Sequence, residues 1–241
     1  MAVITRLGNQ PETLSAQCQN CWLQTFSGKT EFCGAVSSGS ANRQKKVYSK
    51  GENLIRSGDP AKGVFCIASG IAKVSRRGKE STEFIPWVAR PGDILGLNAI
   101  ISDEAFSFSA SAISPITACF IPADVLQQLL LRDPQAFMKL LKRVSDSLTL
   151  LEDRIASLST RKKRELLAEV LISITTPAKE ESKSATLIQC SVKDLASLTG
   201  TSKNYMNKLL ADFSEKEIIS VRNRNVIIRN REALSSIATG N

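Results

Sequence analysis

Histidine is absent from all 241 residues of the chain, and no stretch of the sequence resembles a membrane span. Without histidine, Ser-His-Asp and Cys-His nucleophile systems, histidine-ligated zinc and a histidine ligand to haem are excluded. A transmembrane helix needs about 18 consecutive apolar residues, and no such run occurs. The first residues, MAVITRLGNQPETL, lack the apolar stretch of a secretory signal, so we expect a cytoplasmic protein with no membrane partner.

Acidic residues are the minority, 23 against 32 Lys and Arg, which gives a net charge of +9. The excess is concentrated at the C-terminal end, where residues 159–241 carry 14 basic and 9 acidic side chains. Such a balance favours a polyanionic partner, most often nucleic acid, and the alternative is an ordinary solvated surface.

Turn residues divide the first part of the chain into short segments. Residues 1–46 have little apolar periodicity and are interpreted as an N-terminal arm. Residues 47–133 contain short β-type runs separated by Ser-Gly, Arg-Gly and Pro-Gly-Asp turns, which predict an antiparallel sandwich or barrel. The predicted strands are 64–67, 71–75, 82–88 and 117–121.

A long amphipathic helix is predicted over 134–159, beginning at Pro134. Its apolar residues alternate at spacings of four and three, which is a heptad seam typical of a parallel two-helix dimer. The alternative is a helix packed on its own β-domain, with Leu130, Leu140 and Leu150 supplying that face. The predicted dimer interface consists of Phe137, Leu141, Val144, Leu148, Leu151, Ile155 and Leu158.

Residues 160–241 predict a smaller domain of the winged helix–turn–helix type. A helix over 161–174 and a polar loop over 175–186 precede two short helices, 192–198 and 202–213, which Gly200 separates. A hairpin over 218–228 follows as a basic wing. The second helix exposes Asn and Lys side chains that suit base edges and phosphates, although a helical hairpin that binds nothing is the alternative. The predicted DNA contacts are Thr201, Ser202, Lys203, Asn204, Asn207, Lys208, Arg222 and Arg224.

The six cysteines are Cys18, Cys21, Cys33, Cys66, Cys119 and Cys190. Structural disulfides are unusual in a reducing compartment, so metal ligation, redox chemistry and simple packing remain open. Cys66 and Cys190 lie in apolar runs and are expected to be packed. Cys18 and Cys21 lie in a polar arm, where metal binding or thiol chemistry is the better explanation.

The order of β-roll, long helix and winged helix–turn–helix resembles the CRP/FNR family of bacterial transcription regulators. The matching motifs span roughly residues 47–235, and the residues that carry them are Gly58-Asp59, Ile67-x-Ser69-Gly70-x-x-Lys73-Val74, Pro91-Gly92-Asp93-x-x-Gly96, Ile121-Pro122 and Asp194-Leu195-Ala196-x-x-x-Gly200. The resemblance implies an α+β fold with a cyclic-nucleotide-binding-like jelly roll. It also implies a homodimeric regulator that is not an enzyme, binds a palindromic DNA site and contacts RNA polymerase.

The same resemblance offers two kinds of sensor. Cyclic AMP needs a cationic partner for its phosphate, but no Lys or Arg occurs between Pro91 and Leu131, so we expect no cyclic nucleotide. FNR-type oxygen sensors hold a [4Fe-4S] cluster on four cysteines, which implies iron ligands at Cys18, Cys21, Cys33 and Cys119. The gap between Cys21 and Cys33 is longer than in the FNR-type pattern.

Other interpretations remain open. The same four cysteines could hold zinc, or Cys18 could form a thiol switch with Cys21 or Cys33. A regulator without a cofactor, or one controlled by an organic effector in the roll, is the alternative within the family. A thiol or metal enzyme with an accessory nucleic-acid domain, and an adaptor that dimerises without binding DNA, are more remote alternatives.

Overall fold

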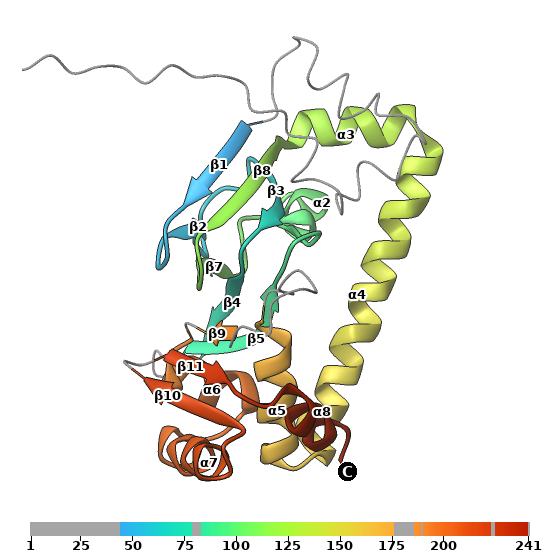
Figure 1. The fold of residues 1–241 in the computed structure, drawn as a ribbon. Coiled ribbons are helices and arrows are strands. Elements are labelled where there is room, and N and C mark those ends of the chain that lie inside the picture. Colours follow the sequence, from blue (N-terminus) through green and yellow to red (C-terminus); the bar gives the residue numbers. More distant parts are fainter. Residues whose placement is uncertain (1–43, 79–82, 176–185, 189, 223–224, 241) are drawn as a thin grey trace, which may run out of the picture.

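The computed structural model describes residues 44–78, 83–175, 186–188, 190–222 and 225–240. A β-roll and a smaller α-rich domain lie at opposite ends of the molecule, and the long helix α4 (Pro134–Thr160) runs alongside and connects them (Figure 1). The arm that carries Cys18, Cys21 and Cys33 lies outside the described residues, and so does Arg224.

Two four-stranded antiparallel sheets form the roll, and the strands predicted from turn residues and apolar runs are confirmed as β3, β4, β5 and β8. The sheets have the orders β1-β8-β3-β6 and β2-β7-β4-β5. The strands are β1 (Gln44–Tyr48), β2 (Asn53–Ile55), β3 (Gly63–Ser69), β4 (Ala72–Arg77), β5 (Glu83–Ala89), β6 (Ile94–Leu95), β7 (Ser109–Ala112) and β8 (Ile116–Pro122).

Alternation along β3 separates two apolar layers, because successive strand residues face opposite sides. Phe65 and Ile67 belong to the cluster in the roll interior, where the rings of Phe65 and Phe120 lie 5.0 Å apart. Val64 and Cys66 belong to a second cluster on the other face. The helices α2 (Leu97–Ser102) and α3 (Ala123–Arg132) contribute apolar side chains to that second cluster.

Helix α4 spans Pro134–Thr160, so the predicted helix is confirmed to within one residue at its end. Leu140 packs in the cluster with α2 and α3 and is 3% exposed, as expected of an intramolecular contact. Leu150 is 68% exposed, so its assignment to the same face was wrong. Ten residues of α-helix leave it about 80° out of line with Leu140, which carries its side chain away from the roll.

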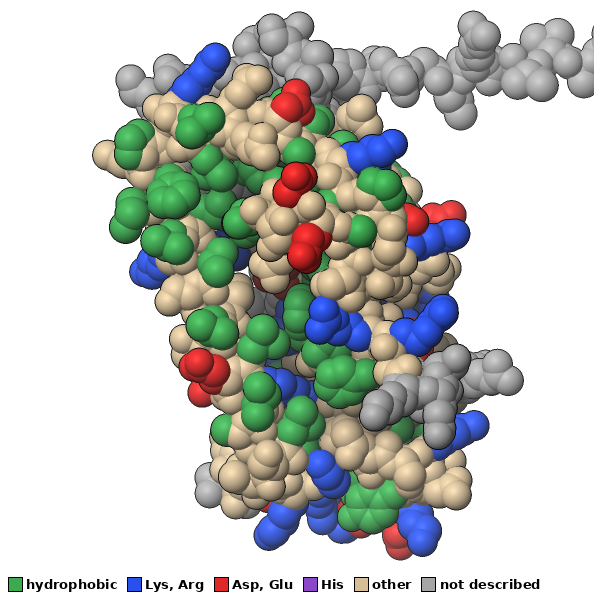
Figure 2. Space-filling model, turned by 180° about the vertical axis from the view of Figure 1, so that it is seen from behind, with side chains coloured by type: hydrophobic (Ala, Val, Ile, Leu, Met, Phe, Trp, Pro, Cys, Tyr) green, Lys and Arg blue, Asp and Glu red, His purple; other side chains and the backbone are tan. Residues whose placement is uncertain are grey.

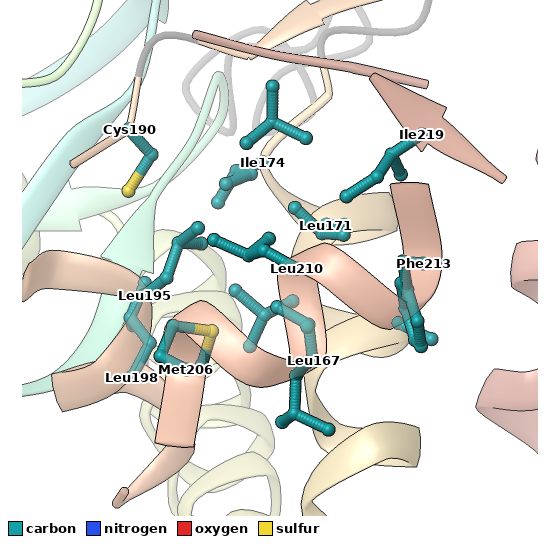
Figure 3. Packing of buried hydrophobic residues seen from close by; sticks show 14 of the residues in the cluster. Leu167, Leu171, Ile174, Cys190, Leu195, Leu198, Met206, Leu210, Phe213 and Ile219 are labelled. Carbon is teal, nitrogen blue, oxygen red and sulfur yellow. The ribbon is translucent and has the colours of Figure 1, made fainter. Parts of the chain in front are cut away.

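The C-terminal domain contains α5 (Lys163–Ser173), β9 (Thr186–Ile188), α6 (Val192–Thr199), α7 (Lys203–Glu215), β10 (Ile219–Arg222), β11 (Asn225–Ile228) and α8 (Arg231–Thr239). The predicted helices and hairpin are confirmed with small shifts in their bounds. Strand β9 joins the hairpin in the order β10-β11-β9, and it begins at Thr186, which was expected to be loop. Apolar side chains from α5, α6, α7 and β10 meet in one core (Figure 3).

In the described part of the chain, no helix combines the length and apolar character that a bilayer crossing requires.

Candidate nucleic-acid interface and thiol pair

Capping residues fix where α6 and α7 begin and where α6 ends. Ser191 caps α6 by accepting a hydrogen bond from the Asp194 N–H at 3.0 Å, and Ser202 caps α7 by accepting from the Tyr205 N–H at 3.2 Å. Gly200 ends α6 in the left-handed conformation with φ of 61°. Because glycine adopts this φ without a side-chain penalty, the chain leaves α6 at Gly200 and starts α7 at Lys203.

Helix α7 has a buried face and an exposed face. Met206, Leu209, Leu210 and Phe213 are buried in the core of the domain. The predicted contacts Ser202, Lys203, Asn204, Asn207 and Lys208 are all exposed, while Thr201 is half-buried in the preceding turn. The structure therefore brings five of these predicted residues to the open side of one helix.

Tyr205 was missed by the sequence analysis, although its side chain is 47% exposed in the first turn of α7. The spacing of the buried residues could have revealed it, because Tyr205 lies one position before Met206 and outside the apolar stripe. The exposed ring of Tyr205 therefore lies at the flank of the basic face of α7.

The wing extends this basic surface. Arg222 is exposed at the end of β10 and pairs with Asn225 across the hairpin. Arg229 lies along the same hairpin, where its Nε donates a hydrogen bond to Ser220 Oγ at 3.0 Å. Blue Lys and Arg side chains gather at the lower end of the molecule, over this domain (Figure 2).

Two cysteines face each other in the outer layer of the roll. Cys66 on β3 and Cys119 on β8 are direct cross-strand partners, each 5% exposed, and both lie in the apolar cluster that includes Leu140 of α4. The sequence analysis singled out Cys119 but gave no sign that Cys66 lies opposite it. Within the described segments, no three potential metal ligands come together.

Cys190 is buried in the C-terminal core, as expected for a packed cysteine. Burial and, secondarily, the negative charge of Asp194 raise the pKa of its thiol to about 12. The nucleophilic thiolate is therefore scarce at neutral pH.

The Pro91-Gly92-Asp93 turn of the roll contacts α4. Asp93 accepts a hydrogen bond from the Arg90 N–H at 2.8 Å, and Arg143 of α4 donates one to the Gly92 carbonyl at 3.1 Å. Burial raises the pKa of Asp93, against the opposing effects of the Arg90 N–H and of the charges on Arg143 and Arg90. The carboxylate is thus engaged within its own turn.

The predicted dimer seam is largely open in the single chain. Phe137, Leu141 and Leu148 are at least half exposed, and green side chains follow α4 along one side of the molecule in Figure 2. Leu158, the last seam residue, is half-buried, and its Cδ2 lies 3.6 Å from where a Cβ would stand on Gly200. The end of α4 therefore reaches the turn between α6 and α7.

The roll also contacts the C-terminal domain directly. Lys73 Nζ on β4 lies 2.8 Å from Asp194 Oδ1 on α6, and Ile85 N on β5 donates to Ser197 Oγ at 3.0 Å. Near the end of α4, Arg154 donates a hydrogen bond to the Leu198 carbonyl. Sequence patterns gave no signal for these contacts between distant residues.

A β-roll joined by a long helix to a winged helix–turn–helix domain defines a class of two-domain DNA-binding transcription regulators. Two family models match the chain, the cyclic nucleotide-binding domain over residues 45–133 and the Crp-like helix-turn-helix domain over residues 165–237. Together they cover more than half of the sequence. The chain belongs to the CRP/FNR family of transcription regulators, and it is not an enzyme.

Curated relatives include the fumarate and nitrate reduction regulatory protein of Vibrio cholerae, 26% identical over 81% of this chain and 78% of the relative. Electron transport regulator A of Shewanella oneidensis has the same identity and coverage. Among solved structures, FixK2 from Bradyrhizobium japonicum is similar with a TM-score of 0.69 and 20% identity, over 82% of this chain and 98% of that one. These likenesses support the resemblance drawn from the sequence motifs.

Proposed function

We propose that the protein is a cytoplasmic homodimer that binds a palindromic DNA site through α7 and the wing, and contacts RNA polymerase from that site. The observation that carries the proposal is the exposed first half of α7, with Lys203, Asn204, Asn207 and Lys208, together with the exposed Arg222 of the wing. Asparagine can read adenine edges, and lysine can reach guanine or phosphate. Two copies related by a two-fold axis would present two such helices to successive half-sites.

A second surface supports the dimer. Five of the seven seam residues of α4 are exposed in the single chain, while Leu151 and Leu158 are half-buried. Large apolar side chains in a regular heptad array are typical of a helix–helix interface. An adaptor that dimerises without DNA would have this seam, but it would have no need for a basic recognition helix.

The DNA part is tested by selecting bound duplexes from a randomised library and measuring affinity for the selected site at several salt concentrations. We expect Lys208→Ala to weaken binding by roughly tenfold, because one charged contact to base or phosphate is lost. Lys216→Ala is the matched control, because Lys216 lies just beyond the end of α7 and is paired with Asp212 at 2.5 Å. Equal effects of the two variants would contradict the placement of the reading surface.

We further propose that the regulator senses oxygen or redox state through a [4Fe-4S] cluster on Cys18, Cys21, Cys33 and Cys119. Cys119 suits a cluster ligand in one respect: it is 5% exposed among apolar side chains, and shielding from solvent is one of the features that tune such centres. When bound, the cluster would supply oxygen-sensitive redox chemistry. The names of the curated relatives, which refer to fumarate and nitrate reduction and to electron transport, point the same way.

Cys119 also has a route to α4, since Leu140 packs in its cluster. A change in the packing around Cys119 would reach the dimer helix near its start through this contact. Cys66, directly across the sheet, shares the same surroundings.

The sensor part is tested by anaerobic purification, iron and sulfide assays and an absorption spectrum before and after exposure to air. We expect four irons and four sulfides per chain, in the ratio of a cubane cluster. Cys119→Ala is expected to lower the iron content severalfold, whereas Cys190→Ala, at a buried thiol in the other domain, is expected to leave it unchanged. An iron-free unaltered protein would refute the cluster and leave the DNA-binding proposal standing.

A further inference from the structure

The C-terminal domain rests on the roll through α6, and we propose that Lys73 of β4 is a positioning residue that fixes recognition helix α7 through this contact. The inference rests on the proposed DNA binding. Lys73 Nζ lies 2.8 Å from Asp194 Oδ1 and 3.1 Å from Glu83 Oε1 on the neighbouring strand β5. The side chains of Lys73 and Asp194 are only 20% and 15% exposed, so water screens their attraction less than at an open surface.

Backbone and apolar contacts widen the interface around this ion pair. Ser197 of α6 accepts a hydrogen bond from the Ile85 N–H at 3.0 Å and donates one to the Glu83 carbonyl at 3.2 Å. Ile85 is 1% exposed and belongs to the same apolar cluster as Leu195 and Met206 of the helix–turn–helix. Figure 1 shows β5 lying next to α6, so the strand edge of the roll serves as a platform for this helix.

The Asp194 carboxylate takes part both in the cap of α6 and in the ion pair with Lys73. Its Oδ2 accepts a hydrogen bond from the Ser191 hydroxyl at 2.8 Å, within the cap of α6, while its Oδ1 meets Lys73. Burial alone would lower the pKa of Lys73, but hydrogen bonds and charge attraction from Asp194 and Glu83 outweigh it and leave the pKa raised. The first turn of α6 is therefore held by a charged lysine of the roll.

The contact leaves the reading surface open. Lys203, Asn204 and Lys208 are exposed on α7, whereas the roll meets α6. Docking therefore sets the pose of α7 without covering it. A palindrome must be met by two recognition helices at a fixed spacing, and a pre-set pose reduces the entropy lost when the second half-site is engaged. One half-site alone imposes no spacing.

The test compares the affinity of the full chain for a duplex with the selected palindrome and for a duplex with one half-site. Lys73→Met keeps the aliphatic stem and removes the charge. Lys62→Met is the matched control, since it removes one positive charge from an exposed position near the start of β3. We expect Lys73→Met to weaken palindrome binding by roughly fivefold with half-site affinity unchanged. Lys73→Arg is expected to restore the palindrome affinity, and Lys62→Met to leave both affinities unaltered.

Equal losses on both duplexes, or tighter binding of the palindrome, would overturn the inference. Ser197→Ala gives a second variant without a change in charge; it removes the two hydrogen bonds to β5 and is expected to shift the palindrome affinity in the same direction. Thermal unfolding of each variant identifies any that does not fold. If the unaltered chain binds neither duplex, the proposed function fails instead.

Discussion

Leu148 in the middle of α4 offers a quantitative test of the dimer seam. Its side chain is 58% exposed in the single chain, and a partner helix on the seam would cover it. Truncation to alanine removes three carbon atoms, which are worth about 2.4 kcal/mol when wholly buried. Scaled by the exposed fraction, the loss is about 1.4 kcal/mol per copy and about 3 kcal/mol per dimer. We therefore expect Leu148→Ala to raise the dimer dissociation constant about a hundredfold.

Leu150→Ala is a closely matched control, because Leu150 is 68% exposed but lies off the seam. Sedimentation equilibrium over a range of concentrations gives the dissociation constant of each variant. The free energy of unfolding of the C-terminal core should be the same in both variants as in the unaltered chain, at concentrations where all of them are dimeric. The heptad assignment is refuted if the two alanine variants weaken the dimer equally, or if neither does.

Two further predictions concern the roll. Gly70→Ala is expected to lower the free energy of unfolding by more than about 2 kcal/mol in urea titrations, because φ is 84° and a Cβ would stand 2.1 Å from the Pro115 carbonyl oxygen. Gly58→Ala, with φ of 91° and open space, should cost only about 1 kcal/mol, and equal costs would argue against the close approach at Gly70. The raised pKa of Asp93 means that its contribution to stability is fully present below pH 3.8 and is lost as the pH rises through the folded-state value. Asp93→Asn should therefore be more stable than the unaltered chain at pH 7, and a less stable variant would show that the Arg90 N–H and the charges on Arg143 and Arg90 outweigh burial.

Elements with strong local signals could be predicted from the sequence. Glycine-containing turns and apolar runs located β3, β4, β5 and β8, and heptad spacing located α4 almost to the residue. Helix α8 was missed, although Asn230 before Arg231 is a recognisable cap and its side chain accepts a hydrogen bond from the Ala233 N–H. Strand β9 has only three residues and follows a polar stretch, so its apolar signal is too short to stand out.

In the candidate site, too, only the features with a local sequence pattern could be predicted. The exposed residues of α7 follow from helical periodicity, because the buried stripe of Met206, Leu209 and Leu210 defines the opposite face. The contacts between domains do not follow from any local pattern. Lys73 and Asp194 are 121 positions apart, and the opposition of Cys66 and Cys119 depends on the register between two strands. Pairings of this kind depend on tertiary packing, which a single sequence does not display.

Helix α4 is attached at two points along its length, to the Gly92 turn through Arg143 and to α6 through Arg154. The helical segment between these two arginines therefore sets a rotational phase between the roll and the C-terminal domain. Inserting one residue would turn one attachment by about 100° relative to the other, whereas seven residues add nearly two whole turns and leave an error of about 20°. Seven residues would, however, also lengthen the helix by about 10 Å, and the direct contacts of Lys73 with Asp194 and of Ile85 with Ser197 would then separate. These contacts therefore fix the length of the segment as well as its rotational phase.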